Sequence, residues 1–249
     1  MKPILLKLKP TSGFSYILHL SFLLILPIAA YLLVTIHFVQ LALSLIVLSK
    51  WRMFAVRPRF WAANIRANSI DLIVGLSLVL FMDHSTSLLI RLLWVVLYAV
   101  WLVYLKPASS TFMVSVQAFI GQLVALMALY LIWSNGPIYG LTALTGLFCF
   151  LAARHFLEAF DEPYDKLLAY IWGYFGASLA WLLSHWLLFY RGVSLTTLLL
   201  SALGYGLSAL YYLDHENKLS KLFKRQIIIA MIVIVGIAII FSGWGNKVV

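Results

Sequence analysis

The chain has 249 residues, of which 64% are hydrophobic and 10% are charged, and its formal net charge is +10. Soluble globular proteins carry roughly 25% charged residues, and one water-exposed fold of this size cannot bury so much apolar surface. The composition therefore excludes a soluble domain and predicts a protein embedded in lipid. The basic residues lie in short clusters between apolar runs, a pattern that favours orientation in a bilayer over nucleic-acid binding.

The apolar runs predict an all-α bundle of about nine membrane spans, because a helix of about 20 apolar residues crosses the bilayer core. The first run, residues 14–48, would be roughly 50 Å long as one helix, so we expect two helices with a turn near residues 35–40. A break at Pro27 is the alternative. Connections between the runs are too short for a soluble domain, so residues 1–249 are predicted to form one membrane domain. The expected spans cover residues 14–34, 39–55, 61–82, 87–105, 111–133, 137–160, 164–190, 193–213 and 226–244.

The distribution of Lys and Arg predicts the orientation of this bundle. With nine spans, most basic residues fall on the side of the N-terminus, and the other side receives only Arg91, Arg191 and Lys247. Because cytoplasmic loops are enriched in Lys and Arg, we expect the N-terminus inside and the C-terminus outside.

Polar side chains in the third expected span are the first candidates for function. In a continuous helix Asn64, Asn68, Asp71 and Gly75 would share one face, and Asp71 would lie about 10 Å beyond Asn64 along the axis. A carboxylate at that depth needs a cation, hydrogen-bond donors or water. The functional reading of this pattern is a proton- or cation-coupled site with Asp71 as the titrating group.

An ion pair that fixes helix register is the alternative reading of Asp71, with Arg91 or Arg66 as its expected partner. Gln122 lies near the middle of the fifth expected span and could share a polar pathway with Asp71. The alternative for Gln122 is an ordinary hydrogen bond between helices.

An acidic cluster follows the sixth expected span. His155 and Glu158 have a spacing that can hold a metal in helical bundles. Asp161 and Glu162, followed by proline, are also typical of a capped helix start, where acidic residues suit the helix dipole. Capping is the preferred interpretation, and we predict no metal and no cofactor.

The densest basic and aromatic segment, residues 50–61, carries Lys50, Arg52, Arg57 and Arg59. We expect these side chains to contact anionic lipid headgroups at the inner interface. A specific site for a phosphorylated lipid or an acidic protein partner is the alternative.

Motifs of the common enzyme classes are absent: the sequence has no phosphate-binding GxxxxGK[ST] loop, no HExxH and no GxSxG. The leading hypothesis is a carrier or channel-like protein for a small solute, ion or lipid, with Asp71, Asn64, Asn68 and Gln122 along its pathway. A structural or assembly subunit with a membrane protein partner is the alternative. An intramembrane lipid-modifying enzyme that uses the acidic cluster is less favoured.

The remaining distinctive segments are Leu48–Val56 with Pro58, Asn64–Asn68 with Asp71, Arg154–Phe156, Phe160–Pro163 and Trp244–Gly245. These segments resemble a family of multi-pass membrane proteins from ultrasmall, host-associated bacteria, the Saccharibacteria group. The resemblance covers most of the chain and implies a bacterial plasma membrane. That family has no established activity, so the resemblance assigns no catalytic or binding residue.

Overall fold

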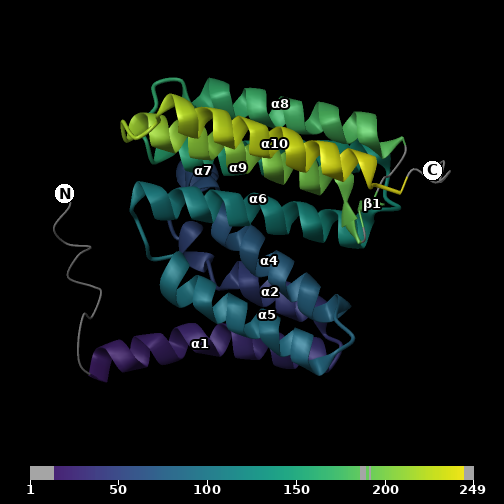
Figure 1. Ribbon diagram of the computed structural model, residues 1–249. Coiled ribbons are helices and arrows are strands. Elements are labelled where there is room, and N and C mark those ends of the chain that lie inside the picture. Colours follow the sequence, from purple (N-terminus) through teal and green to yellow (C-terminus); the bar gives the residue numbers. More distant parts are fainter. Residues whose placement is uncertain (1–13, 186–188, 191, 244–249) are drawn as a thin grey trace. The chain divides into compact units, whose positions relative to one another are not determined.

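A computed structural model describes residues 14–185, 189–190 and 192–243. These residues are almost entirely helical, as predicted (Figure 1). By their contacts they group into two compact units that divide after Ala108. Some of the basic residues whose distribution predicted the orientation lie outside the described residues: Arg191 and Lys247 on one side, and the N-terminal Lys2, Lys7 and Lys9 on the other.

The first unit is built on the hairpin of α1 and α2, which pack against each other and against α4. Helix α1 continues through Pro27 and ends within the predicted turn region, where His37 adopts a positive φ of 63°. Helix α5 packs against α1 and α4. In chain order the elements are α1 (Phe14–Thr35), α2 (Val39–Leu48), η2 (Trp51–Met53), η3 (Pro58–Phe60), α3 (Trp61–Ala67), α4 (Ser69–His84), α5 (Leu88–Val100) and the π-helix η4 (Trp101–Leu105).

The predicted second span, 39–55, is wrong in its C-terminal part, because α2 ends at Leu48. The Ser49 hydroxyl donates to the Ile46 carbonyl at 2.6 Å, and the chain then turns into the short helix η2. The 10 residues of α2 are about 15 Å long, half of what a bilayer core of about 30 Å requires.

The predicted third span, 61–82, is not one straight helix. Its two parts, α3 and α4, meet at Asn68 with a bend of 62°. The Asn68 amide donates to the Asn64 carbonyl at 2.8 Å, and the Ser69 hydroxyl donates to the Arg66 carbonyl at 2.7 Å. Such local side-chain bonds compete with the regular helical pattern. The expectation of one shared face from Asn64 to Gly75 is therefore wrong.

The second unit contains five long helices and one small hairpin. Serine side chains at three helix starts accept a backbone N–H, which satisfies an otherwise unpaired donor: Ser110 on α6, Ser194 on α9 and Ser220 on α10. The elements are α6 (Thr111–Trp133), α7 (Ile138–Glu158), α8 (Asp165–Ser184), β1 (Phe189–Tyr190), β2 (Val193–Ser194), α9 (Leu195–His215) and α10 (Lys221–Ile240).

Two span boundaries in this unit need correction. The span predicted for 164–190 ends at Ser184, and β1 pairs antiparallel with β2 before α9 begins. The span predicted for 226–244 begins earlier, at Lys221, because the Ser220 hydroxyl caps α10 through the N–H of Phe223.

Helices α7 and α8 make the closest helix contact of the second unit. A Cβ atom added at Gly173 would lie 3.0 Å from the Gly146 carbonyl oxygen and 2.9 Å from the Phe150 Cβ. A Cβ at Gly176 would lie 2.7 Å from the Cys149 sulfur. Glycine therefore lets the two backbones approach, as small residues do between helices in lipid.

Among the described residues, 6 helices are long and apolar enough to cross a membrane: α5 with η4, α6, α7, α8, α9 and α10. The bent pair of α3 and α4 makes a seventh if it is counted as one span. The structure therefore supports six or seven crossings and not nine. Large apolar side chains are exposed on these helices and on α1, including Ile240 (71%) and Phe22 (70%).

Candidate functional site

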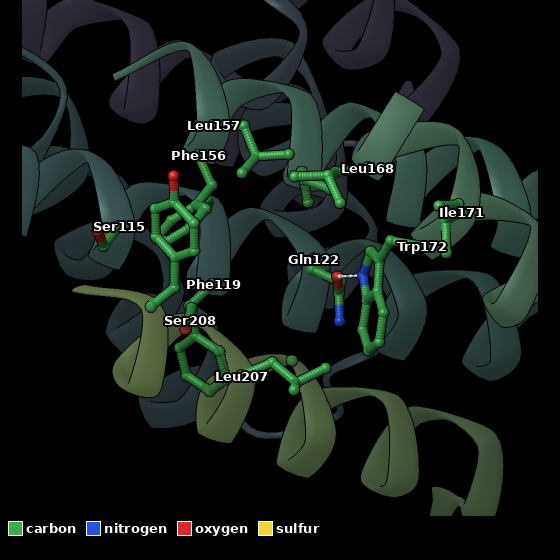
Figure 2. Close-up of a pocket in the computed structure, with 15 residues that line it drawn as sticks. Ser115, Phe119, Gln122, Phe156, Leu157, Leu168, Ile171, Trp172, Leu207 and Ser208 are labelled. Carbon is green, nitrogen blue, oxygen red and sulfur yellow. Dashed lines mark hydrogen bonds between the residues drawn. The ribbon is translucent and has the colours of Figure 1, made fainter. Parts of the chain in front are cut away.

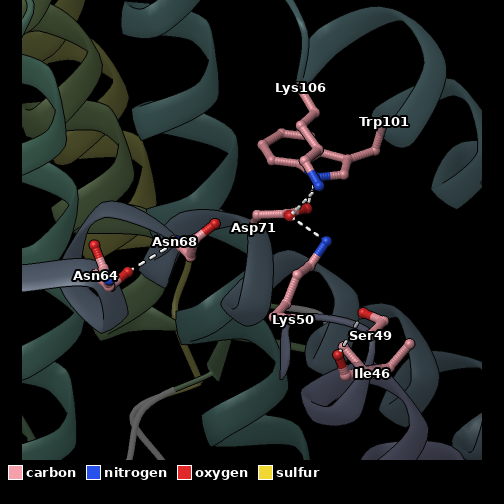
Figure 3. Close-up of polar contacts among 8 residues, drawn as sticks. All are labelled: Ile46, Ser49, Lys50, Asn64, Asn68, Asp71, Trp101 and Lys106. Carbon is pink, nitrogen blue, oxygen red and sulfur yellow. Dashed lines mark hydrogen bonds and ion pairs between the residues drawn. The ribbon is translucent and has the colours of Figure 1, made fainter. Parts of the chain in front are cut away.

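The carboxylate of Asp71 is the centre of a buried charge cluster in the first unit (Figure 3). Its Oδ2 lies 2.5 Å from the Lys50 Nζ and 2.6 Å from the Lys106 Nζ, and its Oδ1 accepts a hydrogen bond of 3.0 Å from the Trp101 indole. The Asp71 and Lys50 side chains are each 10% exposed, whereas Lys106 is 35% exposed. One carboxylate thus compensates two ammonium groups.

The local fold explains why these groups converge. Asp71 lies in the first turn of α4, where a negative charge suits the helix dipole, and not deep inside a long helix as predicted. Lys50 follows the early end of α2. Trp101 and Lys106, five residues apart, would point about 140° away from each other on an α-helix. The π-helix η4, in which the Lys106 N–H bonds the Trp101 carbonyl, lets both contact the same carboxylate.

Electrostatics at Lys50 reflect the uneven charge balance. Burial lowers the pKa of the Lys50 ammonium below its ordinary value, although the Asp71 carboxylate opposes that shift and Lys106 adds to it. The lysine pair is therefore an electropositive centre that a further anion would stabilise.

A cavity of about 590 Å³ adjoins this cluster. One part of its lining is basic or polar and includes Lys50, Arg52, Lys106, Asn64 and Asn68. The other part is apolar and comes mainly from α1, with contributions from α2, η2 and η4; it comprises Phe22, Leu23, Ile25, Leu26, Ala29, Leu45, Met53 and Leu102. The cavity can therefore accommodate an anionic group beside an apolar one.

The predicted third-span residues have separate roles in this arrangement. The Asn64 amide donates to the Met53 carbonyl at 3.3 Å, which ties α3 to η2, and Asn68 marks the bend. The expected partners of Asp71 were also wrong, because Lys50 and Lys106 pair with it. Arg91 instead donates to the carbonyls of Met82 and Ser85.

The predicted lipid-facing basic residues divide into two groups. Lys50 is turned inward onto Asp71, and Arg52 lines the cavity. Arg57 and Arg59 are exposed in the loop and turn before α3, and the Arg59 guanidinium lies 4.6 Å from the ring centre of Phe60.

Gln122 belongs to the second unit, and its amide links three helices. The Oε1 atom accepts a hydrogen bond of 2.8 Å from the Trp172 indole on α8, and Nε2 donates at 3.0 Å to the Leu200 carbonyl on α9. These are the interhelical bonds that the alternative reading expected. Asp71 and Gln122 lie in different units.

The acidic cluster also divides among several partners. His155 Nε2 pairs with Gln117 at 3.0 Å, whereas Glu158 pairs with Arg154 at 2.9 Å. The Tyr211 hydroxyl donates to Glu162. In the part of the chain that the structure describes, no three His, Cys, Asp or Glu side chains form a group that could hold a metal ion.

The capping interpretation of Asp161 and Glu162 is wrong in detail. Helix α8 begins at Asp165 after Tyr164, and no side chain caps it. Asp161 instead occupies a turn with a φ of 51°. Asp165 supplies the acidic first turn and pairs with Arg154 at 2.6 Å.

Sequence reasoning did not identify Lys106 and Trp101 as site residues. The only signal in the sequence was a lysine directly before Pro107, at the end of an apolar run. Their contact with Asp71 depends on the π-helix η4, which no local sequence pattern predicted.

The long apolar helices and the exposed apolar surface make this chain a multi-helix membrane protein. Comparisons with protein-family models, curated proteins and solved structures found no significant match. The site itself is therefore the basis for assigning a function.

Proposed function

We propose that this membrane protein is carrier-like and binds an anionic lipid by its headgroup in the cavity of the first unit. The observation that carries the proposal is a cavity with basic side chains on one part of its wall and apolar side chains on another. Basic pockets between membrane helices are typical sites for anionic lipid headgroups.

The charge balance supports an anionic ligand. Lys50, Arg52 and Lys106 line the cavity, and the one carboxylate beside it, Asp71, pairs with the two lysines. No acidic side chain is among the described residues that line the cavity. A phosphate group would receive charge-assisted hydrogen bonds there, which are roughly twice as strong as neutral ones. The apolar wall of α1 would meanwhile contact the hydrocarbon of the same lipid.

Arg52 provides the sharpest test, because it lines the cavity without belonging to the ion cluster around Asp71. We expect Arg52→Gln to weaken binding of dioleoylphosphatidic acid about fivefold, since one basic residue near an anionic lipid contributes about 1 kcal/mol. Lipid titration followed by native mass spectrometry measures this affinity. Arg57→Gln, an exposed arginine outside the cavity lining, is the matched control and should bind like the wild type. Equal losses in the two variants would contradict the site.

A structural or assembly subunit is the second candidate, and the pairing of Asp71 favours it. The carboxylate joins the end of α2, the start of α4 and the end of η4, which is what an ion pair that fixes helix register does. Transport distinguishes the two candidates. A carrier should speed the movement of fluorescent phosphatidic acid across the bilayer of proteoliposomes, and a purely structural subunit should not.

The orientation and location of the protein complete the proposal. The excess of Lys and Arg supports placing the cavity near the inner leaflet, where anionic lipids give a negative surface potential. The resemblance to the Saccharibacteria family supports a bacterial plasma membrane. A membrane protein partner would belong to the structural candidate.

A further inference from the structure

A second cavity lies wholly within the second unit and has the opposite chemistry. It has a volume of about 320 Å³ and is lined by α6, α7, α8 and α9 (Figure 2). Its aromatic lining is Phe119, Phe156, Trp172 and Tyr211. No Lys, Arg, His, Asp or Glu is among the described residues that line it.

The polar atoms of this lining are mostly engaged with the protein. The Ser115 and Ser208 hydroxyls donate to carbonyls of their own helices, and the Tyr211 hydroxyl donates to Glu162. These groups therefore offer little to a charged or strongly polar ligand, and the desolvation of such a ligand would be uncompensated.

Gln122 is the exception. Its side-chain amide has two N–H donors, and the bond to the Leu200 carbonyl uses one of them. Gln122 is only 5% exposed, and the hydrogen bond to the Leu200 carbonyl is the one that its amide nitrogen donates among the described residues. Figure 2 shows this amide among the lining side chains, fixed by the Trp172 indole. A buried donor of this kind is costly unless a ligand or water supplies an acceptor.

The rim of the cavity indicates where a ligand comes from. Leu168, Ile171 and Leu207 line it and are themselves 38%, 56% and 49% exposed. They lie on α8 and α9, in spans that are apolar enough to cross a membrane. These exposed apolar side chains on helices that can cross a membrane favour a ligand that enters from the hydrocarbon of the bilayer.

We infer that this cavity binds a neutral lipid whose carbonyl or hydroxyl oxygen accepts a hydrogen bond from the Gln122 amide while its hydrocarbon packs on the aromatic wall. In an apolar pocket, a small number of polar groups fixes the orientation of the ligand, and Gln122 is positioned to do so. The site is independent of the anionic-lipid site proposed for the first unit.

Photocrosslinking tests this inference on the full chain in nanodiscs. The probe is a dioleoylglycerol with a diazirine in one acyl chain, and adducts are mapped by peptide mass spectrometry. We expect adducts on Phe119, Ile171 and Leu207 that excess unlabelled dioleoylglycerol suppresses. An unlabelled hydrocarbon of similar length, which lacks the oxygen, should suppress them less.

A cavity-filling variant supplies the matched comparison. Ala153→Phe introduces a ring into the lining and should reduce these adducts about tenfold, equivalent to about 1.4 kcal/mol of binding, because the ring occupies space that the ligand needs. Ala230→Phe makes the same change at an exposed position of α10 and should leave the adducts unchanged. Even labelling of all exposed helix faces without competition would overturn the inference. Equal suppression by the hydrocarbon would overturn the role of Gln122.

Discussion

Replacing Asp71 with asparagine is expected to lower the free energy of unfolding by about 3–5 kcal/mol, because it leaves Lys50 and Lys106 without their shared counter-ion. Thermal unfolding of the purified protein in detergent measures the loss. Asp83→Asn, at the exposed far end of the same helix, is the matched control and should change little.

The pH dependence of this variant provides an independent readout. Burial lowers the pKa of Lys50 in the folded protein, so above that pKa the unfolded chain binds more protons than the folded one. Stability of Asp71→Asn should therefore rise as the pH approaches the ordinary pKa of lysine. An apolar triple variant, with leucine at Asp71, Lys50 and Lys106, should recover much of the lost stability. Full stability of Asp71→Asn at neutral pH would contradict the description of this cluster.

Replacing Gly173 with alanine is expected to destabilise the second unit by about 1–3 kcal/mol, because the added methyl group has no room. It would meet the Gly146 carbonyl oxygen, a backbone atom that cannot move without separating α7 from α8. Thermal unfolding again measures the loss.

Gly236→Ala is the matched control for this prediction. Gly236 also lies inside a membrane helix, α10, but a Cβ there would have nothing within 4 Å. Alanine should be neutral at this position or slightly stabilising, because glycine costs about 0.5–1 kcal/mol in a helix. Equal effects of the two substitutions would show that helix propensity, and not close packing, determines the change in stability.

Hydropathy predicted the class of the protein and most of its long helices. Helix α6, Thr111–Trp133, has the predicted bounds because a serine cap precedes it and one uninterrupted apolar run forms it. Hydropathy failed at α2 and at the bend between α3 and α4. In both places local bonds from Ser49, Asn68 and Ser69 to the backbone end or redirect a helix, and such bonds are not visible in a hydropathy pattern.

The candidate site was predictable only in part. The cost of a carboxylate in lipid identified Asp71 as a residue that needs a partner. Its partners could not be predicted, because Lys50 and Lys106 reach it through the early end of α2 and through the π-helix η4. Gln122 was identified in the same way, as a polar residue within a span, and its bonds to α8 and α9 depend on tertiary packing.

Native mass spectrometry of the gently solubilised wild-type protein tests the central claim, that the first unit binds an anionic lipid, most directly. We predict that the protein retains a phospholipid with an anionic headgroup, that Arg52→Gln retains about fivefold less of it, and that Arg57→Gln retains as much as the wild type. The carrier proposal would be contradicted if the protein were released from the detergent without an anionic lipid and with a stoichiometric protein partner. That result would favour the structural subunit.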